Sequence, residues 1–194
     1  MSVPLSFSAV LLAGGRSSRM GADKALLPTQ GRPLWQRQVE VLRAAGAREI
    51  FFSVRPEQAW IPAGVQVVQD AVAGAGPLAG IAAALAACGD GHLAVLAVDL
   101  PRMEPAWFAR LLERCGPGAG AVGRRGNFYE PLAAIYPREL LAAATEALAR
   151  GELSLQAFIA GAGTRMRSVE IGSNESEWFL NWNEPSAAPR SPGA

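Results

Sequence analysis

The sequence has 194 residues, of which 50% are hydrophobic and 18% are charged, and its formal net charge is +1. This length suits one domain with one sizeable core, and the composition is that of a globular protein. A net charge so close to zero argues against broad electrostatic binding to nucleic acid or to an acidic membrane. The arginines cluster locally instead, which fits recognition of a small anion.

Cysteine and histidine are too scarce for most metal and nucleophile chemistry. Cys88 and Cys115 lie far apart and form no CxxC pair, so we expect reduced thiols and no zinc site. The single histidine, His92, precedes an apolar run and is expected to be structural. With one histidine in the sequence, a Ser-His-Asp or Cys-His mechanism is therefore not expected.

The sequence also gives an expectation about location. No segment reaches about 18 uninterrupted apolar residues, so no transmembrane helix is expected. The apolar run near the N-terminus leads straight into glycines, unlike the cleavage site of a signal peptide. We therefore expect a cytoplasmic protein.

Strands and helices are expected to alternate through about the first 115 residues. Short apolar runs predict strands at Ser8–Ala13, Glu49–Val54, Val65–Val68 and Leu93–Val98. Helical spacing or a leading proline predicts helices from Pro33 to Gly46, at Pro77–Cys88 and at Glu104–Arg114. This alternation is typical of a parallel sheet with right-handed crossovers.

The second half departs from this alternation. Turn residues between Ala121–Gly123 and Tyr129–Tyr136 predict a hairpin or added edge strands. The remaining expected elements are helices at Glu139–Arg150 and Leu155–Ala160, the second with Ser154 as its N-cap, and short strands at Arg167–Ile171 and Phe179–Trp182. The stretch Glu184–Ala194 is rich in Pro, Ser and Ala and is expected to be a disordered tail.

The first candidate site is the stretch LLAGGRSSRMGADKALLP, residues 11–28, where an apolar strand runs into two glycines. Gly14 and Gly15 permit a sharp turn that brings backbone N–H groups close to an anion. Arg16 and Lys24 add positive charge, and Lys24 is a compact donor for a phosphate oxygen. The glycine patterns of a P-loop and of a dinucleotide fingerprint are absent. The alternative is an ordinary turn with solvated charges.

The second candidate site follows the expected strand at Val65–Val68. Asp70 suits a hydrogen bond from a sugar hydroxyl or a base amine, and the segment AGAGPLAG, which ends at Gly80, comes next. Its glycines would let the backbone pass close to a nucleotide, and the helix opened by Pro77 presents its positive dipole end. The alternative is a plain loop, since such residues favour turns without a ligand.

The third candidate is Asp99, at the end of the apolar strand Leu93–Val98. A carboxylate there is costly without a partner, and Mg²⁺ held between it and phosphates is one such partner. The alternative is an aspartate that caps the following turn. Ligands of an open doubly wound sheet bind outside the carboxyl ends of its strands, so the three candidates predict one shared pocket.

Weaker candidates occur later in the chain. Glu130, in NFYEPLAAIY, and Asn181 and Asn183, in FLNWNEP, are placed to line the far side of this pocket. Each of them could equally be a loop residue that satisfies backbone groups.

Together these residues resemble the molybdenum cofactor guanylyltransferase family, within the wider nucleotidyltransferases that make sugar nucleotides. The family's opening motif, LAGGxSxRMGxDKxLL, matches Leu12–Leu27 almost throughout. Asp70 with the following GPLAG, the Asp-x-Pro that begins at Asp99, and the Asn-x-Asn-x-Pro that begins at Asn181 match later motifs. The matches follow the family order over nearly the whole chain.

The resemblance implies one nucleotidyltransferase domain over residues 1–183. Its fold would be three-layer α/β/α, with a mostly parallel Rossmann-like sheet of the nucleotide-diphospho-sugar transferase type. It would transfer GMP from GTP to molybdopterin, with Mg²⁺ as cofactor and release of pyrophosphate. We expect a monomer or weak homo-oligomer that contacts molybdopterin-handling proteins transiently.

The resemblance also gives individual residues their roles. Asp99 would be the metal ligand, and Lys24 would contact the phosphates. The full set of residues expected near the nucleotide or the metal is Leu12, Ala13, Gly14, Gly15, Lys24, Asp70, Gly80 and Asp99. Asn181 and Asn183 stand where the family has pocket residues near metal and acceptor. This chain departs from the family after the second strand, where Arg55 follows FSV and an asparagine is common, and at Glu184, which replaces the threonine of the late NTP.

The mechanism that fits both lines of reasoning is an in-line attack by an acceptor phosphate oxygen on the α-phosphorus of a nucleoside triphosphate. Two anions must meet, so positioning and charge neutralisation matter more than proton abstraction. Lys24, Asp99 and Arg16 are the expected catalytic residues, and Asp23 is expected to orient the loop. An acceptor phosphate is already ionised, which agrees with the near absence of histidine.

Three alternatives remain open from the sequence. The nearest is a molybdopterin cytidylyltransferase or a sugar- or alcohol-phosphate nucleotidyltransferase, because base choice depends on a few pocket contacts. The second is a nucleotide-binding module without turnover, against which the presence of both Lys24 and Asp99 argues. The third is a nicotinamide-dependent dehydrogenase, for which the glycine spacing is wrong.

Overall fold

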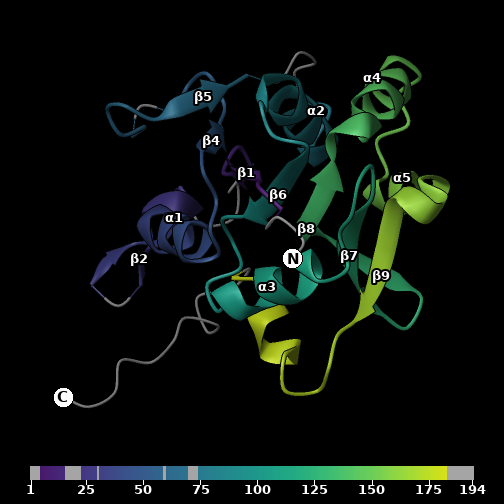
Figure 1. Cartoon of the computed structure of the whole chain (residues 1–194). Coiled ribbons are helices and arrows are strands. Elements are labelled where there is room, and N and C mark those ends of the chain that lie inside the picture. Colours follow the sequence, from purple (N-terminus) through teal and green to yellow (C-terminus); the bar gives the residue numbers. More distant parts are fainter. Residues whose placement is uncertain (1–4, 16–22, 30, 59, 70–73, 183–194) are drawn as a thin grey trace.

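The computed structural model describes residues 5–15, 23–29, 31–58, 60–69 and 74–182. Their central element is a seven-stranded sheet with the order β5-β4-β1-β6-β8-β7-β9 (Figure 1). Its strands are β1 Ser8–Leu12, β4 Ile50–Ser53, β5 Gln66–Val68, β6 His92–Ala97, β7 Gly120–Arg125, β8 Phe128–Pro137 and β9 Met166–Glu170. β8 runs antiparallel to β6 and β7, whereas the other neighbouring strands are parallel to each other.

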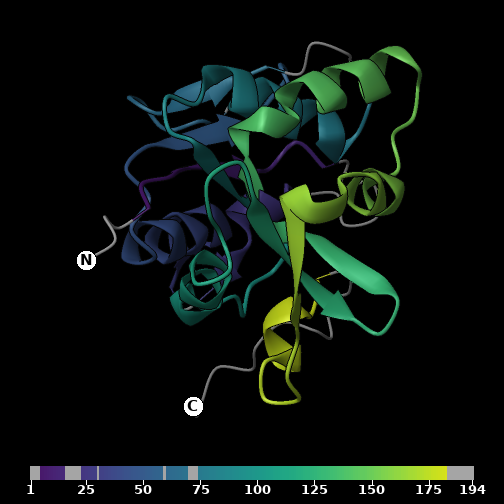
Figure 2. The same ribbon diagram turned by 45° about the vertical axis from the view of Figure 1, so that its right-hand side comes forward.

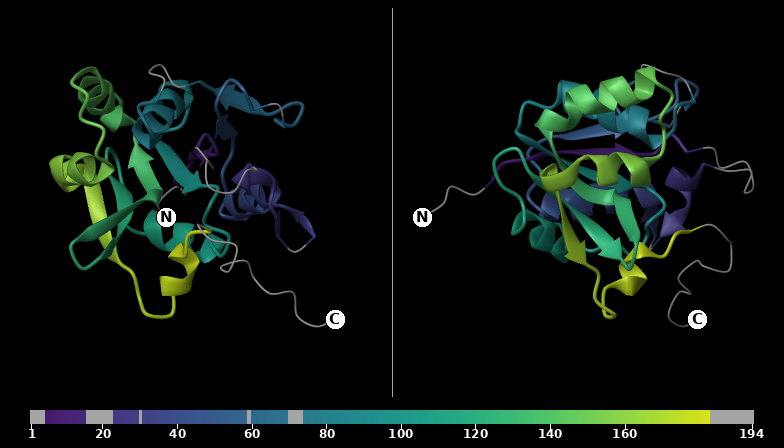
Figure 3. Two further views of the ribbon diagram at one scale, coloured as in Figure 1. Left: turned by 180° about the vertical axis from the view of Figure 1, so that it is seen from behind. Right: turned by 90° about the vertical axis from the view of Figure 1, so that its right-hand side faces the viewer.

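Five α-helices cover the two faces of this sheet in the described part of the chain. They are α1 Leu34–Ala44, α2 Pro77–Ala87, α3 Pro105–Leu112, α4 Leu141–Ala149 and α5 Leu155–Gly161. Figures 2 and 3 show α2 and α4 on one side of the sheet and α1 and α3 on the other. The result is the three-layer α/β/α arrangement that the family resemblance implies.

Side chains of β1 alternate between the two core layers. Ala9 and Leu11 join the cluster that includes α1 and α3, whereas Val10 joins the cluster that includes α2 and α4. A strand buried on both faces reads as a continuous apolar run, because neither face can carry polar residues. Because β1, β4 and β6 are mostly apolar and buried, the sequence pattern predicted their positions correctly.

Three predictions about secondary structure need correction. The segment Phe179–Trp182 is not a strand: a short 3-10 turn covers Ser176–Phe179, and Phe179 and Trp182 are buried against the α3 side. The apolar character of this segment reflects packing in the core instead: the ring of Phe179 meets that of Trp107 edge-on, with centroids 4.9 Å apart. The helix predicted from Glu139 begins with a 3-10 turn over Arg138–Leu140, and Pro33 is the N-cap of α1 rather than its first residue.

Smaller elements complete the picture. A two-stranded hairpin that the sequence did not predict joins β2 Pro28–Thr29 to β3 Arg32–Pro33. Two further 3-10 turns lie at Lys24–Leu26 and Gly163–Arg165. Ser154 caps α5 as predicted, since its Oγ accepts a hydrogen bond from the Ala157 N–H at 3.3 Å. Within the described residues, no helix combines the length and apolar character needed to cross a membrane.

The scarce cysteine and histidine side chains take structural positions. Cys88 is buried and Cys115 is half-buried, and both are free thiols. Burial raises the pKa of the Cys115 thiol to about 12, so it stays protonated and unreactive at neutral pH. His92 Nε2 lies 3.1 Å from the carbonyl oxygens of Gly116 and Ala119, contacts that fit the structural role expected for it.

Gly120 offers a test of how tightly β7 packs on β8. A Cβ at this position would lie 2.0 Å from the Ile135 carbonyl oxygen and 2.8 Å from Pro137 Cδ. We expect Gly120→Ala to lower the free energy of unfolding by about 2 kcal/mol or more, because backbone must move to make room. At this chain length the change corresponds to roughly 4 °C or more in Tm, measurable by thermal denaturation.

The matched control is Gly116→Ala in the same region. Its Cβ would meet Arg167 Nη1 at 3.5 Å, an ordinary contact. The control should leave Tm near that of the unmodified chain, and an equal Tm for both variants would contradict the clash.

Candidate active site

The candidate active site lies at the carboxyl ends of β1 and β6, which are adjacent and parallel. In their register Leu12 pairs with Ala97, and the Val98 N–H donates a hydrogen bond to the Leu12 carbonyl at 3.0 Å. The glycine turn after β1 and the Asp99 turn after β6 therefore leave the sheet side by side. This placement fits the general rule that ligands bind outside the carboxyl ends of such strands.

Lys24 and Asp99, 75 positions apart in the sequence, form an ion pair at this edge. Lys24 Nζ lies 3.5 Å from Asp99 Oδ2, and the two side chains are 20% and 27% exposed. Lys24 begins the 3-10 turn Lys24–Leu26, which Asp23 caps by accepting a hydrogen bond from the Ala25 N–H. The structure thus brings together the two residues on which the sequence-based mechanism depends.

The turn that carries Asp99 is held by Gln38, a residue the sequence analysis missed. Gln38 is fully buried in α1, and its Nε2 donates to the Leu100 carbonyl at 2.7 Å, with the carbonyls of Ala97 and Val98 at 3.4 Å. Leu34, Gln38 and Leu42 recur every four residues on the buried face of α1. A polar residue on such a stripe must find partners, and this signal could have identified it.

The C-terminal segment closes on the same turn. The Trp182 N–H donates to the Asp99 carbonyl at 2.9 Å, which places the preceding, exposed Asn181 next to the turn. Asn181 is therefore brought to the site region. Arg16, Asp70 and Asn183 lie outside the described residues.

The three residues after β1, Ala13, Gly14 and Gly15, differ in how closely the rest of the protein packs around them. Ala13 is buried, with its N–H bound to the Ser53 carbonyl and its carbonyl bound by Gln58. Counting only contacts with the described residues, a Cβ on Gly14 would make ordinary contacts and one on Gly15 would meet nothing within 4 Å. Packing against this part of the chain therefore does not demand glycine at either position.

Close packing explains why glycine stands at position 80. It is buried in α2, where a Cβ would lie 2.4 Å from Ser53 Oγ and 3.0 Å from Leu12 Cδ2. Its missing side chain lets α2 approach the ends of β1 and β4. Gly80 therefore sits directly behind the predicted nucleotide contact Leu12, which is half-buried.

Glu130 lies on β8, the antiparallel neighbour of β6. The pairing of these two strands ends at Leu96 and Ala133, and Glu130 pairs instead with Gly123 of β7, just beyond a register shift. Burial raises the pKa of the half-buried Glu130 carboxyl, and Arg125 opposes this shift. The strand register therefore does not place Glu130 level with Asp99.

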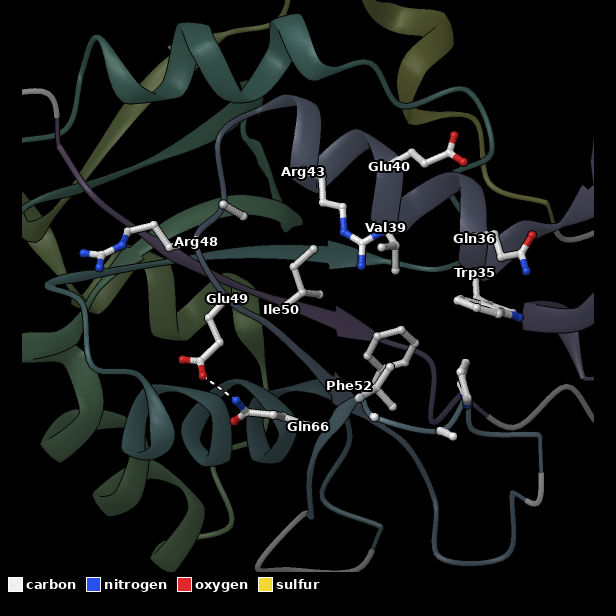
Figure 4. A pocket seen from close by; sticks show the side chains of 15 residues that line it. Trp35, Gln36, Val39, Glu40, Arg43, Arg48, Glu49, Ile50, Phe52 and Gln66 are labelled. Carbon is white, nitrogen blue, oxygen red and sulfur yellow. Dashed lines mark hydrogen bonds between the residues drawn. The ribbon is translucent and has the colours of Figure 1, made fainter.

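Two surface hollows lie elsewhere. One of about 550 Å³ runs along α1, β4 and β5, where Glu49 accepts a hydrogen bond from Gln66 (Figure 4). Another of about 520 Å³ lies between α4 and α5. Among the predicted site residues that the structure describes, none lines either hollow.

Comparison with known proteins identifies the family. The family model of the MobA-like NTP transferase domain matches residues 9–169. A protein of Opitutus terrae named "Probable molybdenum cofactor guanylyltransferase" is 48% identical over 185 residues, which are 93% of this chain and 92% of the relative. A molybdenum cofactor guanylyltransferase of Pseudomonas putida is 36% identical over 77% of this chain and 80% of its own.

Solved structures agree on the fold. Molybdopterin-guanine dinucleotide biosynthesis protein A from Archaeoglobus fulgidus superimposes with a TM-score of 0.74 at 22% identity, covering 92% of this chain and 93% of its own. The 2-C-methyl-D-erythritol 4-phosphate cytidylyltransferase of Thermus thermophilus gives a TM-score of 0.67 at 21% identity, over 91% and 93% of the two chains. The fold is therefore that of the nucleotidyltransferases. With its family-model match and its curated relatives, the chain belongs to the molybdenum cofactor guanylyltransferase family of MobA-like nucleotidyltransferases.

Proposed function

We propose that this chain transfers GMP from Mg²⁺-bound GTP to the terminal phosphate of molybdopterin and releases pyrophosphate. The observation that carries the proposal is the Lys24–Asp99 pair, 3.5 Å apart at the strand ends of a guanylyltransferase fold. Membership of the family supports GTP and molybdopterin as the substrates.

The residues present fit a magnesium ion. Mg²⁺ is usually held by one or two carboxylates together with substrate phosphates rather than by an all-protein cage. Asp99 offers such a carboxylate, partly exposed at the strand ends. When bound, the ion would neutralise phosphate charge as a Lewis acid, with Asp99 as its protein ligand.

In the proposed reaction an acceptor phosphate oxygen forms a bond to the α-phosphorus of GTP. The bond from the α-phosphorus to the bridging oxygen breaks, and the electron pair leaves with pyrophosphate. Lys24 stabilises the charge that moves onto this leaving group. The acceptor oxygen is already ionised at neutral pH, so no side chain has to remove a proton.

Further roles complete the proposal. Leu12, Ala13 and Gly14 contact guanine or ribose, and the backbone N–H groups of Gly14 and Gly15 contact phosphate. Arg16 adds charge for the triphosphate, Asp70 contacts the nucleotide, and Asn181 and Asn183 lie toward the acceptor. Gly80 supports this surface by allowing α2 to pack against Leu12.

The test is a panel of the nucleoside triphosphates with Mg²⁺, scored by pyrophosphate release with and without molybdopterin. We expect release with GTP and molybdopterin together, and a product containing both. A preference for CTP would overturn the guanylyl assignment in favour of cytidylyl transfer. Binding of GTP without pyrophosphate release from any acceptor would instead indicate a nucleotide-binding module.

A further inference from the structure

Gln58 lies in the connection between β4 and β5 and directs its hydrogen bonds toward the β1 side of the site. The side chain is 6% exposed. Its Oε1 accepts from the Arg55 N–H at 2.6 Å, while its Nε2 donates both to the Ala13 carbonyl at 3.0 Å and to Asp23 Oδ2. A buried amide with several partners is fixed in position, because losing any of them leaves a polar group unsatisfied.

The two acceptors of Gln58 belong to different parts of the candidate site. Ala13 directly follows β1, and Asp23 is the N-cap of the 3-10 turn that begins with Lys24. One amide group thus joins the end of the central strand to the turn that presents the lysine. Residues 16–22 run between these two points and lie outside the described residues.

Neighbouring side chains strengthen the same connection. Trp60 Nε1 donates to Asp23 Oδ2 at 2.7 Å, and the Trp60 ring stacks on Trp35 with centroids 6.3 Å apart. Arg55 Nη1 donates to the Gly15 carbonyl at 3.2 Å. Hydrogen bonds to the Asp23 carboxylate are charge-assisted, so they are stronger than those between neutral groups.

We propose that Gln58 is a positioning residue for the transfer: by binding the Ala13 carbonyl and the Asp23 carboxylate at once, it sets where Lys24 stands relative to Asp99. Gln58 does not touch the reacting atoms and acts through Asp23. This role rests on the proposed function, since it concerns the same site. It also explains why Asp23, rather than binding ligand, orients the turn.

The decisive variant is Gln58→Glu, which keeps the shape of the side chain. Its second oxygen would face two acceptors, the Ala13 carbonyl and the Asp23 carboxylate, in place of the Nε2 donor. We expect kcat for GTP to fall about tenfold or more at pH 8, with a smaller change in KM, because displacement of Lys24 costs charge stabilisation in the transition state.

The pH profile separates positioning from a general loss of structure. Two facing carboxylates raise the pKa of one of them, so a proton is taken up as the pH falls. Once protonated, the carboxyl group introduced at position 58 can again donate a hydrogen bond to Asp23. The gap in kcat between Gln58→Glu and the unmodified chain should therefore narrow from pH 8 to pH 6. A defect that persists unchanged at both pH values would contradict the proposal.

Two more variants complete the experiment. Gln66→Glu introduces the same change at an exposed glutamine that also donates to a carboxylate, that of Glu49, and should leave kcat within twofold. Gln58→Ala removes the amide without adding charge and should also lower kcat about tenfold, with no recovery at pH 6. If Gln58→Glu does not fold, Gln58→Ala decides by itself.

The outcomes are distinct from those of the proposed function. If the unmodified chain releases pyrophosphate and folded Gln58 variants match Gln66→Glu in kcat, the positioning role is wrong and the proposed function stands. If the unmodified chain releases none, the proposed function fails and the role of Gln58 fails with it.

Discussion

Asp99→Ala is expected to lower turnover by about 10² or more. The substitution removes the carboxylate proposed to hold Mg²⁺ and also the partner of Lys24 at 3.5 Å, so two charge-stabilising features are lost together. The measurement is the steady-state rate of pyrophosphate release with GTP, molybdopterin and saturating Mg²⁺. Asp99→Asn preserves the side-chain shape and should show the same loss, with a higher Mg²⁺ concentration needed for half-maximal rate.

The matched control for Asp99 is Glu146→Gln. Glu146 is an exposed carboxylate on α4 that also faces a cation, Arg150, at 3.6 Å. Removing its charge should leave the rate unchanged, since such surface pairs contribute little. Near-normal pyrophosphate release from folded Asp99→Ala would rule out its assignment as the metal ligand.

Lys24→Ala is expected to cause a loss of similar size, about 10² or more in kcat. Its ammonium is the proposed donor to the pyrophosphate leaving group, and an alanine leaves that charge without its partner. Lys24→Arg keeps the charge but replaces a compact ammonium by a planar fork, so we expect it to recover only part of the rate.

Two comparisons make this second experiment decisive. Arg150→Ala, which removes an exposed cation from the end of α4, should leave the rate unchanged. The affinity of each variant for GTP, measured by equilibrium binding, separates a binding defect from a catalytic one. A Lys24→Ala enzyme with unaltered kcat would show that another group supports the leaving pyrophosphate.

The sequence predicted the central strands β1, β4 and β6 because they are short and mostly buried. β1, β4 and β6 are mostly apolar, and a short run of this kind is typical of a strand with both faces covered. The prediction failed at Phe179–Trp182, where the same apolar signal comes from two aromatic rings that pack beneath α3. Apolar spacing reports burial, and it does not report whether a neighbouring strand is available to pair.

Some residues of the candidate site could likewise be predicted from the sequence and others could not. Lys24 and Asp99 could be predicted to meet, because each follows a central strand and the strand ends share one edge. The partners of Gln38 and Gln58 could not be predicted in this way, because they are backbone carbonyls and a carboxylate that only the tertiary structure brings near. For Gln38, the sequence could have indicated burial on α1, but not the turn that it binds. Residues that support a site are therefore harder to predict from sequence than residues that perform its chemistry.

The lysine that pairs with Asp99 at the candidate site can be labelled selectively. Of the 18 lysine and arginine residues in the chain, Lys24 is the only lysine. Apart from the N-terminal amine, every reagent selective for primary amines, such as an active ester or a nucleotide dialdehyde, therefore has one target. An adduct on the peptide that contains this residue reports directly on the candidate active site, and the arginines that carry the remaining positive charge stay silent.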